Sequence, residues 1–189
     1  MTLNSLKIYY FSAIDKASAV KLIQMIIIDI ETTGLSPSTN RITEIALIEI
    51  SANGRHEEWS SLVNPAVEIS SMIEGLTGIT NDMVRSAPSF ASLADSLYAR
   101  LAGKQLVAHN AAFDYGFLQA EFERVGLKFE TNTMCTVKLS KALFPQHRTH
   151  SLDALIERHA LPVEGRHRAL ADARIVVHFL RAVEALPAD

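Results

Sequence analysis

Acidic side chains stand close together, or close to a histidine, at three places in this chain. The first is Asp29-Ile30-Glu31, which ends a short run of isoleucines. Side chains on a strand alternate between its two faces, so Asp29 and Glu31 would point the same way. Two carboxylates on one face of an aliphatic strand are costly to ionise together. Taken alone, this pair also fits the solvated end of a strand.

The second place is His109-Asn110-Ala111-Ala112-Phe113-Asp114, which follows a short apolar segment. Asn110 is a favourable helix N-cap, which would put Asp114 in the first turn of a helix. A carboxylate there lies near the positive end of the helix dipole. Because complementing the dipole is the commoner use of such an acid, Asp114 alone does not establish a site.

The third place is His167-Arg168-Ala169-Leu170-Ala171-Asp172. In the helix expected here, Asp172 lies at the edge of the apolar face. At about 100° per residue, His167 and Asp172 would point about 140° apart if one helix held both. For both to reach one site, His167 must therefore lie in the loop before the helix. A loop histidine by itself is more often an ordinary surface residue.

Together the three places supply four carboxylates and one histidine from separate elements. This set is rich in oxygen and contains no sulfur, so it suits Mg²⁺ or Mn²⁺ rather than structural zinc. Two such ions about 4 Å apart serve in-line displacement at a phosphodiester. The set therefore predicts a metal-dependent phosphodiester hydrolase. A purely structural role would not explain why four acids converge from separate elements.

The elements that must position these side chains can be predicted from the pattern of apolar residues. We expect strands at 26–30, 42–50 and 57–63, and the Asn53-Gly54 pair is a hairpin signal between the last two. One further strand is expected at 105–109. Helices are expected at 90–101, 110–125, 136–144, 151–159 and 168–185. This order predicts an α/β fold: a mixed sheet with an antiparallel three-strand meander, flanked by helices.

Composition narrows the class of protein further. The chain has 189 residues, is 48% hydrophobic and carries a net charge of −3, which fits a globular protein without the broad basic coat that holds duplex DNA. Its single cysteine, Cys135, excludes an intramolecular disulfide framework. No segment has the length of a membrane helix, and Asp15 and Lys16 interrupt the N-terminal apolar run. We expect a cytoplasmic protein that contacts no membrane.

We expect two regions along the chain. Residues 25–185 would form one catalytic domain, and residues 1–24 would be an N-terminal extension of unknown role, with a strand at 6–11 and a helix at 17–24.

The three acidic segments, in this order, resemble the three motifs of the DEDDh 3′–5′ exonucleases. The likeness runs from about residue 25 to about residue 183. Further segments are similar to the epsilon-type proofreading members of that family, which belong to bacterial replicative DNA polymerases: Pro65, Gly78-Ile79-Thr80 and Ser151-Leu152-Asp153-Ala154-Leu155. The resemblance implies a ribonuclease-H-like fold and two bound ions, Mg²⁺ or Mn²⁺.

The same resemblance implies a role for each acidic residue. Asp29 would bridge both metals, Glu31 and Asp172 would hold the one beside the attacking water, and Asp114 would hold the other. His167 would be the general base. The products would be nucleoside 5′-monophosphates released from a 3′ end.

Substrate-binding residues are also implied by the resemblance, namely Thr32, Leu35, Thr77, Asn110 and Phe113. Thr32 has a competing structural role, because a hydroxyl after a strand often caps a turn. Thr77 departs from the epsilon pattern, in which a histidine commonly precedes Gly-Ile-Thr.

The expected substrate is a DNA 3′ end, single-stranded or mismatched, in replication proofreading or DNA repair. Two alternatives stay open: an exoribonuclease that trims RNA 3′ ends, and a catalytically silent nucleic-acid-binding module. Only four residues follow the last expected helix, and they are too few to form an anchor. We therefore expect a free-standing exonuclease and not a stably held polymerase subunit.

Overall fold

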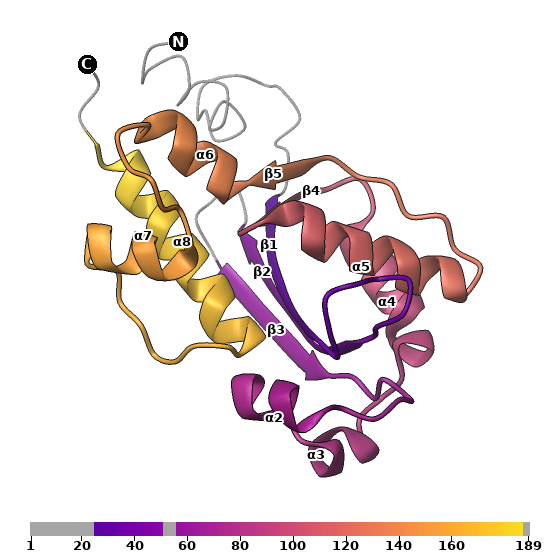
Figure 1. Cartoon of the computed structure of the whole chain (residues 1–189). Helices are drawn as coiled ribbons and strands as arrows, with labels where there is room; N and C mark the ends of the chain where they lie inside the picture. Colours follow the sequence, from indigo (N-terminus) through magenta and orange to yellow (C-terminus); the bar gives the residue numbers. More distant parts are fainter. Residues whose placement is uncertain (1–24, 51–55, 187–189) are drawn as a thin grey trace.

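The computed structural model describes residues 25–50 and 56–186, and its strands form one mixed sheet (Figure 1). The strands are β1 (Met25–Thr32), β2 (Ile42–Ile50), β3 (His56–Leu62), β4 (Gln105–Ala108) and β5 (Thr133–Cys135). Their order across the sheet is β3-β2-β1-β4-β5. The strand and helix expected within 1–24, and the Asn53-Gly54 turn, lie outside the described residues.

The pairing of the strands confirms the predicted meander. β1 pairs antiparallel with β2, and β2 pairs antiparallel with β3, whereas β1 to β4 and β4 to β5 are parallel. The architecture is therefore the α/β, ribonuclease-H-like one expected from the sequence. β5 was not predicted, because three residues are too few to show a period of two.

Helices cover both faces of this sheet. The described helices are α2 (Ser71–Thr77), α3 (Asn81–Arg85), α4 (Phe90–Leu101), α5 (Ala111–Arg124), α6 (Thr136–Leu143), α7 (Leu152–His159) and α8 (Ala169–Glu184), of which α2 and α3 pack in a small cluster of their own. The sequence predicted all of these except α2 and α3. Each of those two is shorter than two and a half turns, and each begins at a hydroxyl N-cap, Ser70 or Thr80.

β1 is buried on both faces, which explains its unbroken isoleucines. The side chains of Ile26, Ile28 and Ile30 pack in the core against α4 and α5, while Ile27 packs in a second core against α8. Figure 1 shows the sheet lying between the pair α4 and α5 and the pair α7 and α8. Asp29 and Glu31 lie two and four residues after Ile27 on the same strand. Their side chains therefore point to the same face as Ile27, the face that α8 covers.

None of the helices within the described residues is long and apolar enough to span a bilayer. The cytoplasmic location expected from the sequence stays a prediction.

Candidate active site

Three carboxylates meet where the end of β1 faces the beginning of α8. Asp29 and Glu31 come from β1, and Asp172 lies in the first turn of α8. One carboxylate oxygen of each residue lies within 4.8 Å of the other two. The sequence predicted this convergence from strand alternation, from the position of Asp172 at the edge of its helix face, from the chemistry of the set and from the family resemblance.

The electrostatics of this cluster show a shortage of positive charge. Burial, then the charges of Asp114 and Asp172, raise the pKa of Asp29 well above its ordinary value. Burial and the neighbouring Asp172 raise the pKa of Glu31 to about 7. The Oδ1 atom of Asp172 is buried and has no hydrogen-bond partner in the described part of the chain. Clustered carboxylate oxygens with an unused lone-pair site fit a hard divalent cation such as Mg²⁺ or Mn²⁺.

Asp114 lies beside this cluster, in the first turn of α5, and its side chain is buried. Burial raises the pKa of Asp114 to about 8, while hydrogen bonds from the backbone of Asp114 and Ile30 oppose the rise. Of the charges that raise the pKa of Asp29, that of Asp114 has the largest effect. Three of the four predicted acids therefore form a close group, and the fourth, Asp114, raises the pKa of Asp29 through its charge.

Asn110 occupies the N-cap position of α5, but its side chain makes no capping hydrogen bond. Its backbone has a φ of 71°, in the left-handed region, whereas a capping residue is ordinarily extended. The prediction that Asn110 is the N-cap residue of this helix is confirmed, but its side chain does not cap the helix. Asparagine tolerates this backbone conformation better than most residues.

His167 lies in the loop immediately before α8, as the angular argument required, and its backbone is also left-handed, with a φ of 58°. Arg168 follows it and donates to both carboxylate oxygens of Glu44, at 3.1 and 2.7 Å. The backbone N–H of Ala169 donates to Glu44 as well, at 2.9 Å. This buried carboxylate on β2 therefore fixes the start of α8 and the loop that carries His167.

Arg166 stands on the other side of His167 and contacts the cluster itself. Its Nε donates to Asp153 on α7 at 2.8 Å, and its Nη1 donates to Asp172. Sequence reasoning missed Arg166 and Glu44 as residues of this site. A signal existed for Glu44, because it interrupts the apolar strand Ile42–Ile50.

Two of the predicted substrate-binding side chains are available to a ligand to very different degrees. Leu35 is 86% exposed, directly after the turn that follows β1. The Thr32 hydroxyl instead donates to the carbonyl of Gly34 at 2.6 Å, which is the turn-capping role that competes with substrate binding. Their contacts with a nucleotide stay predictions.

Two more of the five predicted substrate-binding side chains, those of Phe113 and Thr77, pack within the protein, and the contact of Asn110 with a nucleotide stays a prediction. Phe113 is half-buried, and its ring centroid lies 4.9 Å from that of Phe117. Thr77 is buried; its hydroxyl donates to the Ile73 carbonyl at 2.9 Å and accepts from the Ile79 N–H at 3.1 Å. The structure thus gives Thr77 a structural use at the end of α2, and its role in substrate binding stays a prediction.

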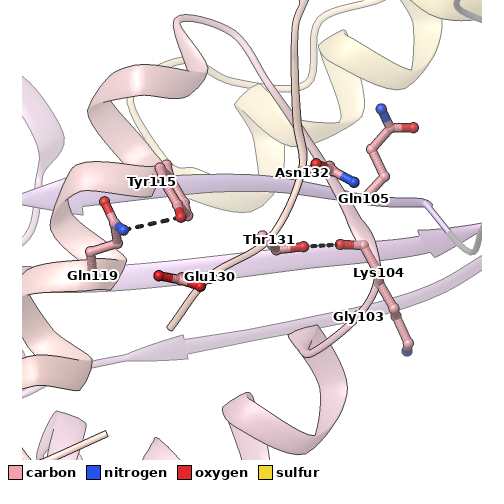
Figure 2. A pocket seen from close by; sticks show the side chains of 8 residues that line it. All are labelled: Gly103, Lys104, Gln105, Tyr115, Gln119, Glu130, Thr131 and Asn132. Carbon is pink, nitrogen blue, oxygen red and sulfur yellow. Dashed lines mark hydrogen bonds between the residues drawn. The ribbon is translucent and has the colours of Figure 1, made fainter. Parts of the chain in front are cut away.

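A polar hollow of about 690 Å³ lies elsewhere, near the amino ends of β4 and β5 (Figure 2). It is lined by Gly103, Lys104, Gln105, Tyr115, Gln119, Glu130, Thr131 and Asn132. The ammonium of Lys104 pairs with Glu49 at 2.8 Å. Because β1 and β4 run parallel and the acidic cluster lies at the carboxyl end of β1, the hollow and the cluster are separate features.

Comparisons with known proteins agree on one family. The model of a family described as "Exonuclease" (RNase T) matches residues 26–180. The chain is 37% identical over 161 residues to the PolC-type DNA polymerase III of Thermotoga maritima, covering 84% of this chain and 12% of that one. It is 36% identical over 166 residues to the 3′-5′ exonuclease DinG of Bacillus subtilis, covering 86% of this chain and 18% of that one.

A solved structure gives the same result. Exonuclease X in complex with 5′-overhanging duplex DNA matches with a TM-score of 0.66 and 30% identity, over 87% of this chain and 95% of that chain. By contrast, the chain spans less than a fifth of the length of either curated relative.

Proposed function

The chain belongs to the exonuclease family (RNase T), and on this premise we propose that it hydrolyses DNA from the 3′ end, at single-stranded or mismatched termini, in replication proofreading or repair. The observation that carries the proposal is the group of Asp29, Glu31 and Asp172, whose oxygens lie within 4.8 Å of one another. The curated relatives named as a polymerase III and as a 3′-5′ exonuclease support DNA as the substrate.

The family depends on divalent metal, and this chain carries an acidic cluster suited to it. We propose that Asp29, Glu31 and Asp172 hold one Mg²⁺ or Mn²⁺ ion, and that Asp114 and Asp29 hold a second. When bound, the ions supply positive charge that favours in-line displacement at a phosphodiester.

The residues of the chain perform the remaining tasks. His167 accepts a proton from the attacking water, and the neighbouring Arg168–Glu44 pair holds its loop against β2. The terminal nucleotide lies between the exposed side chain of Leu35 and the half-buried ring of Phe113. Each cycle releases a nucleoside 5′-monophosphate and leaves a new 3′ end.

An assay with 5′-labelled single-stranded, mismatched and fully paired DNA tests this proposal, with matched RNA alongside. We expect stepwise shortening with Mg²⁺ or Mn²⁺, none with EDTA, and none from the Asp29→Ala variant. Shortening that persists in EDTA would contradict the metal site. Faster release from RNA than from DNA would instead identify an exoribonuclease, and no release from any substrate would identify a silent binding module.

We further propose that residues 25–185 form the catalytic unit and that the enzyme acts without a stably bound polymerase. Both stay predictions. Mixing the purified chain with its host's replicative polymerase on a sizing column tests the second of them. Stoichiometric co-elution at micromolar concentration would contradict it.

A further inference from the structure

Arg166 divides its guanidinium between two carboxylates from different helices. It bonds to Asp153 of α7 through Nε and to Asp172 of α8 through Nη1. The Arg166 side chain is 22% exposed and that of Asp172 only 10%, whereas the side chain of Asp153 is 72% exposed. One of its partners is therefore a buried ligand of the proposed metal centre, and the other is a surface carboxylate.

In this state Arg166 supplies positive charge to the whole acidic cluster. Its charge lowers the pKa of Asp29 and of Glu31, against the larger effects of burial and of the neighbouring acids that raise both. Arg168 also lowers the pKa of Glu31, but its guanidinium is bonded to Glu44 and not to a cluster carboxylate. The guanidinium of Arg166 is thus the cation that touches the cluster in the described structure.

A divalent ion held by Asp29, Glu31 and Asp172 would compete with this contact. Asp172 has one oxygen bonded to Arg166 and one buried oxygen without a partner in the described residues. A metal ion on Asp172 repels a guanidinium on the same carboxylate, because both are positive. Asp153 offers Arg166 a second carboxylate that needs no new contact to form.

We propose that Arg166 is the resident counter-cation of the metal centre, bonded to Asp172 when no metal is present and retained by Asp153 alone once metal binds. This inference rests on the metal site of the proposed function. Arg166 is then a positioning residue. It stabilises the fold without metal by offsetting the repulsion among the carboxylates, and it lowers the affinity of the site for metal by competing for Asp172. Asp153 reduces that loss of affinity by holding the displaced guanidinium.

Calorimetric titration of Mn²⁺ into the whole chain tests this, on the wild type and on Arg166→Gln. We expect Arg166→Gln to bind Mn²⁺ about tenfold more tightly and to melt at a lower temperature in EDTA. Arg174→Gln is the matched control, because Arg174 lies on α8 two residues after Asp172 but pairs with Glu58 and Glu164. It loses the same charge, and we expect its Mn²⁺ affinity to match that of the wild type.

Asp153→Asn provides the second test, at a side chain that is 72% exposed. We expect it to weaken Mn²⁺ binding severalfold in the wild type and to have no effect in the Arg166→Gln background, because Asp153 acts through Arg166. An equal effect in both backgrounds would mean that Asp153 acts directly by its charge, and would overturn its proposed role.

Two results separate this inference from the proposed function. Mn²⁺ binding that is unchanged or weaker in Arg166→Gln would overturn the counter-cation role and leave the metal site standing. Absence of Mn²⁺ binding by the wild type would overturn both, since it removes the metal centre itself.

Discussion

Raising the pH should destabilise the metal-free enzyme near neutrality. The pKa of Glu31 is raised to about 7 and that of Asp114 to about 8, mainly by burial. In the unfolded chain both carboxyls titrate near pH 4, so above pH 7 they are ionised there. The native state then holds more protons than the unfolded state, and stability falls as the pH rises. His109, whose pKa is lowered to about 4, is neutral in the native state throughout this range.

The magnitude follows from the number of protons involved. Between pH 7 and 8.5, Glu31 and Asp114 together retain on average close to one proton in the native state, given these pKa values. Each proton changes stability by about 1.4 kcal/mol per pH unit, so the loss over this range is about 2 kcal/mol. For a chain of this size that corresponds to a fall in Tm of about 4–8 °C.

Thermal melts in EDTA at pH 7 and 8.5 measure this effect, and the Glu31→Gln/Asp114→Asn double variant is the control. We expect the fall in Tm to shrink markedly in that variant, because it lacks both titrating groups. Added Mn²⁺ should reverse the trend in the wild type, since metal binds the ionised carboxylates and displaces their protons. An equal fall in wild type and double variant would refute the reasoning.

Three substitutions test the assigned roles. Asp29→Ala should abolish metal-dependent cleavage. Its stability in EDTA should equal or exceed that of the wild type, because the substitution removes a buried carboxyl whose pKa is raised. Nuclease rates near those of the wild type in Mg²⁺ would exclude Asp29 as a metal ligand. His167→Ala should lower turnover by about 10²–10⁴ with little change in substrate affinity, because it removes the proposed general base. A turnover rate equal to that of the wild type would make His167 an ordinary surface residue. Glu44→Gln should lower the free energy of unfolding, measured in urea, by about 1–3 kcal/mol, because it weakens the three hydrogen bonds that Glu44 accepts from Arg168 and Ala169. An unfolding midpoint equal to that of the wild type would show that Glu44 and Arg168 do not hold the loop.

Local periodicity was enough to predict that Asp29 and Glu31 share one face and that His167 precedes the last helix. Their convergence with Asp172 in one site was predicted instead from the chemistry of the set and from the family resemblance. The alternation of Asp29 and Glu31 along one strand, and the angle between His167 and Asp172 in a helix, depend only on backbone geometry. The structure confirms where these four residues lie, and their catalytic roles stay predictions. The family resemblance added the assignment of Asp114, whose local pattern indicated only a dipole partner.

What the sequence could not predict depends on long-range pairing. Arg166 bonds to Asp153 across a loop and to Asp172 in the next helix, and no period in the sequence relates these positions. Glu44 and Arg168 are joined only because α8 packs on β2, far away along the chain. The Asn110 side chain does not cap its helix because its backbone is left-handed, which residue type alone does not determine.

The packing of α8 against β1 has a consequence for the order of events during synthesis. Asp29 and Glu31 leave the ribosome before Asp172, which follows them by more than a hundred residues, on the last described helix. Contacts so far apart along a chain form late, because the intervening segment must be ordered first. A nascent chain therefore carries an incomplete set of ligands until α8 docks. If the proposed metal site is correct, a nascent chain lacks nuclease activity until α8 has been made and has packed on the sheet.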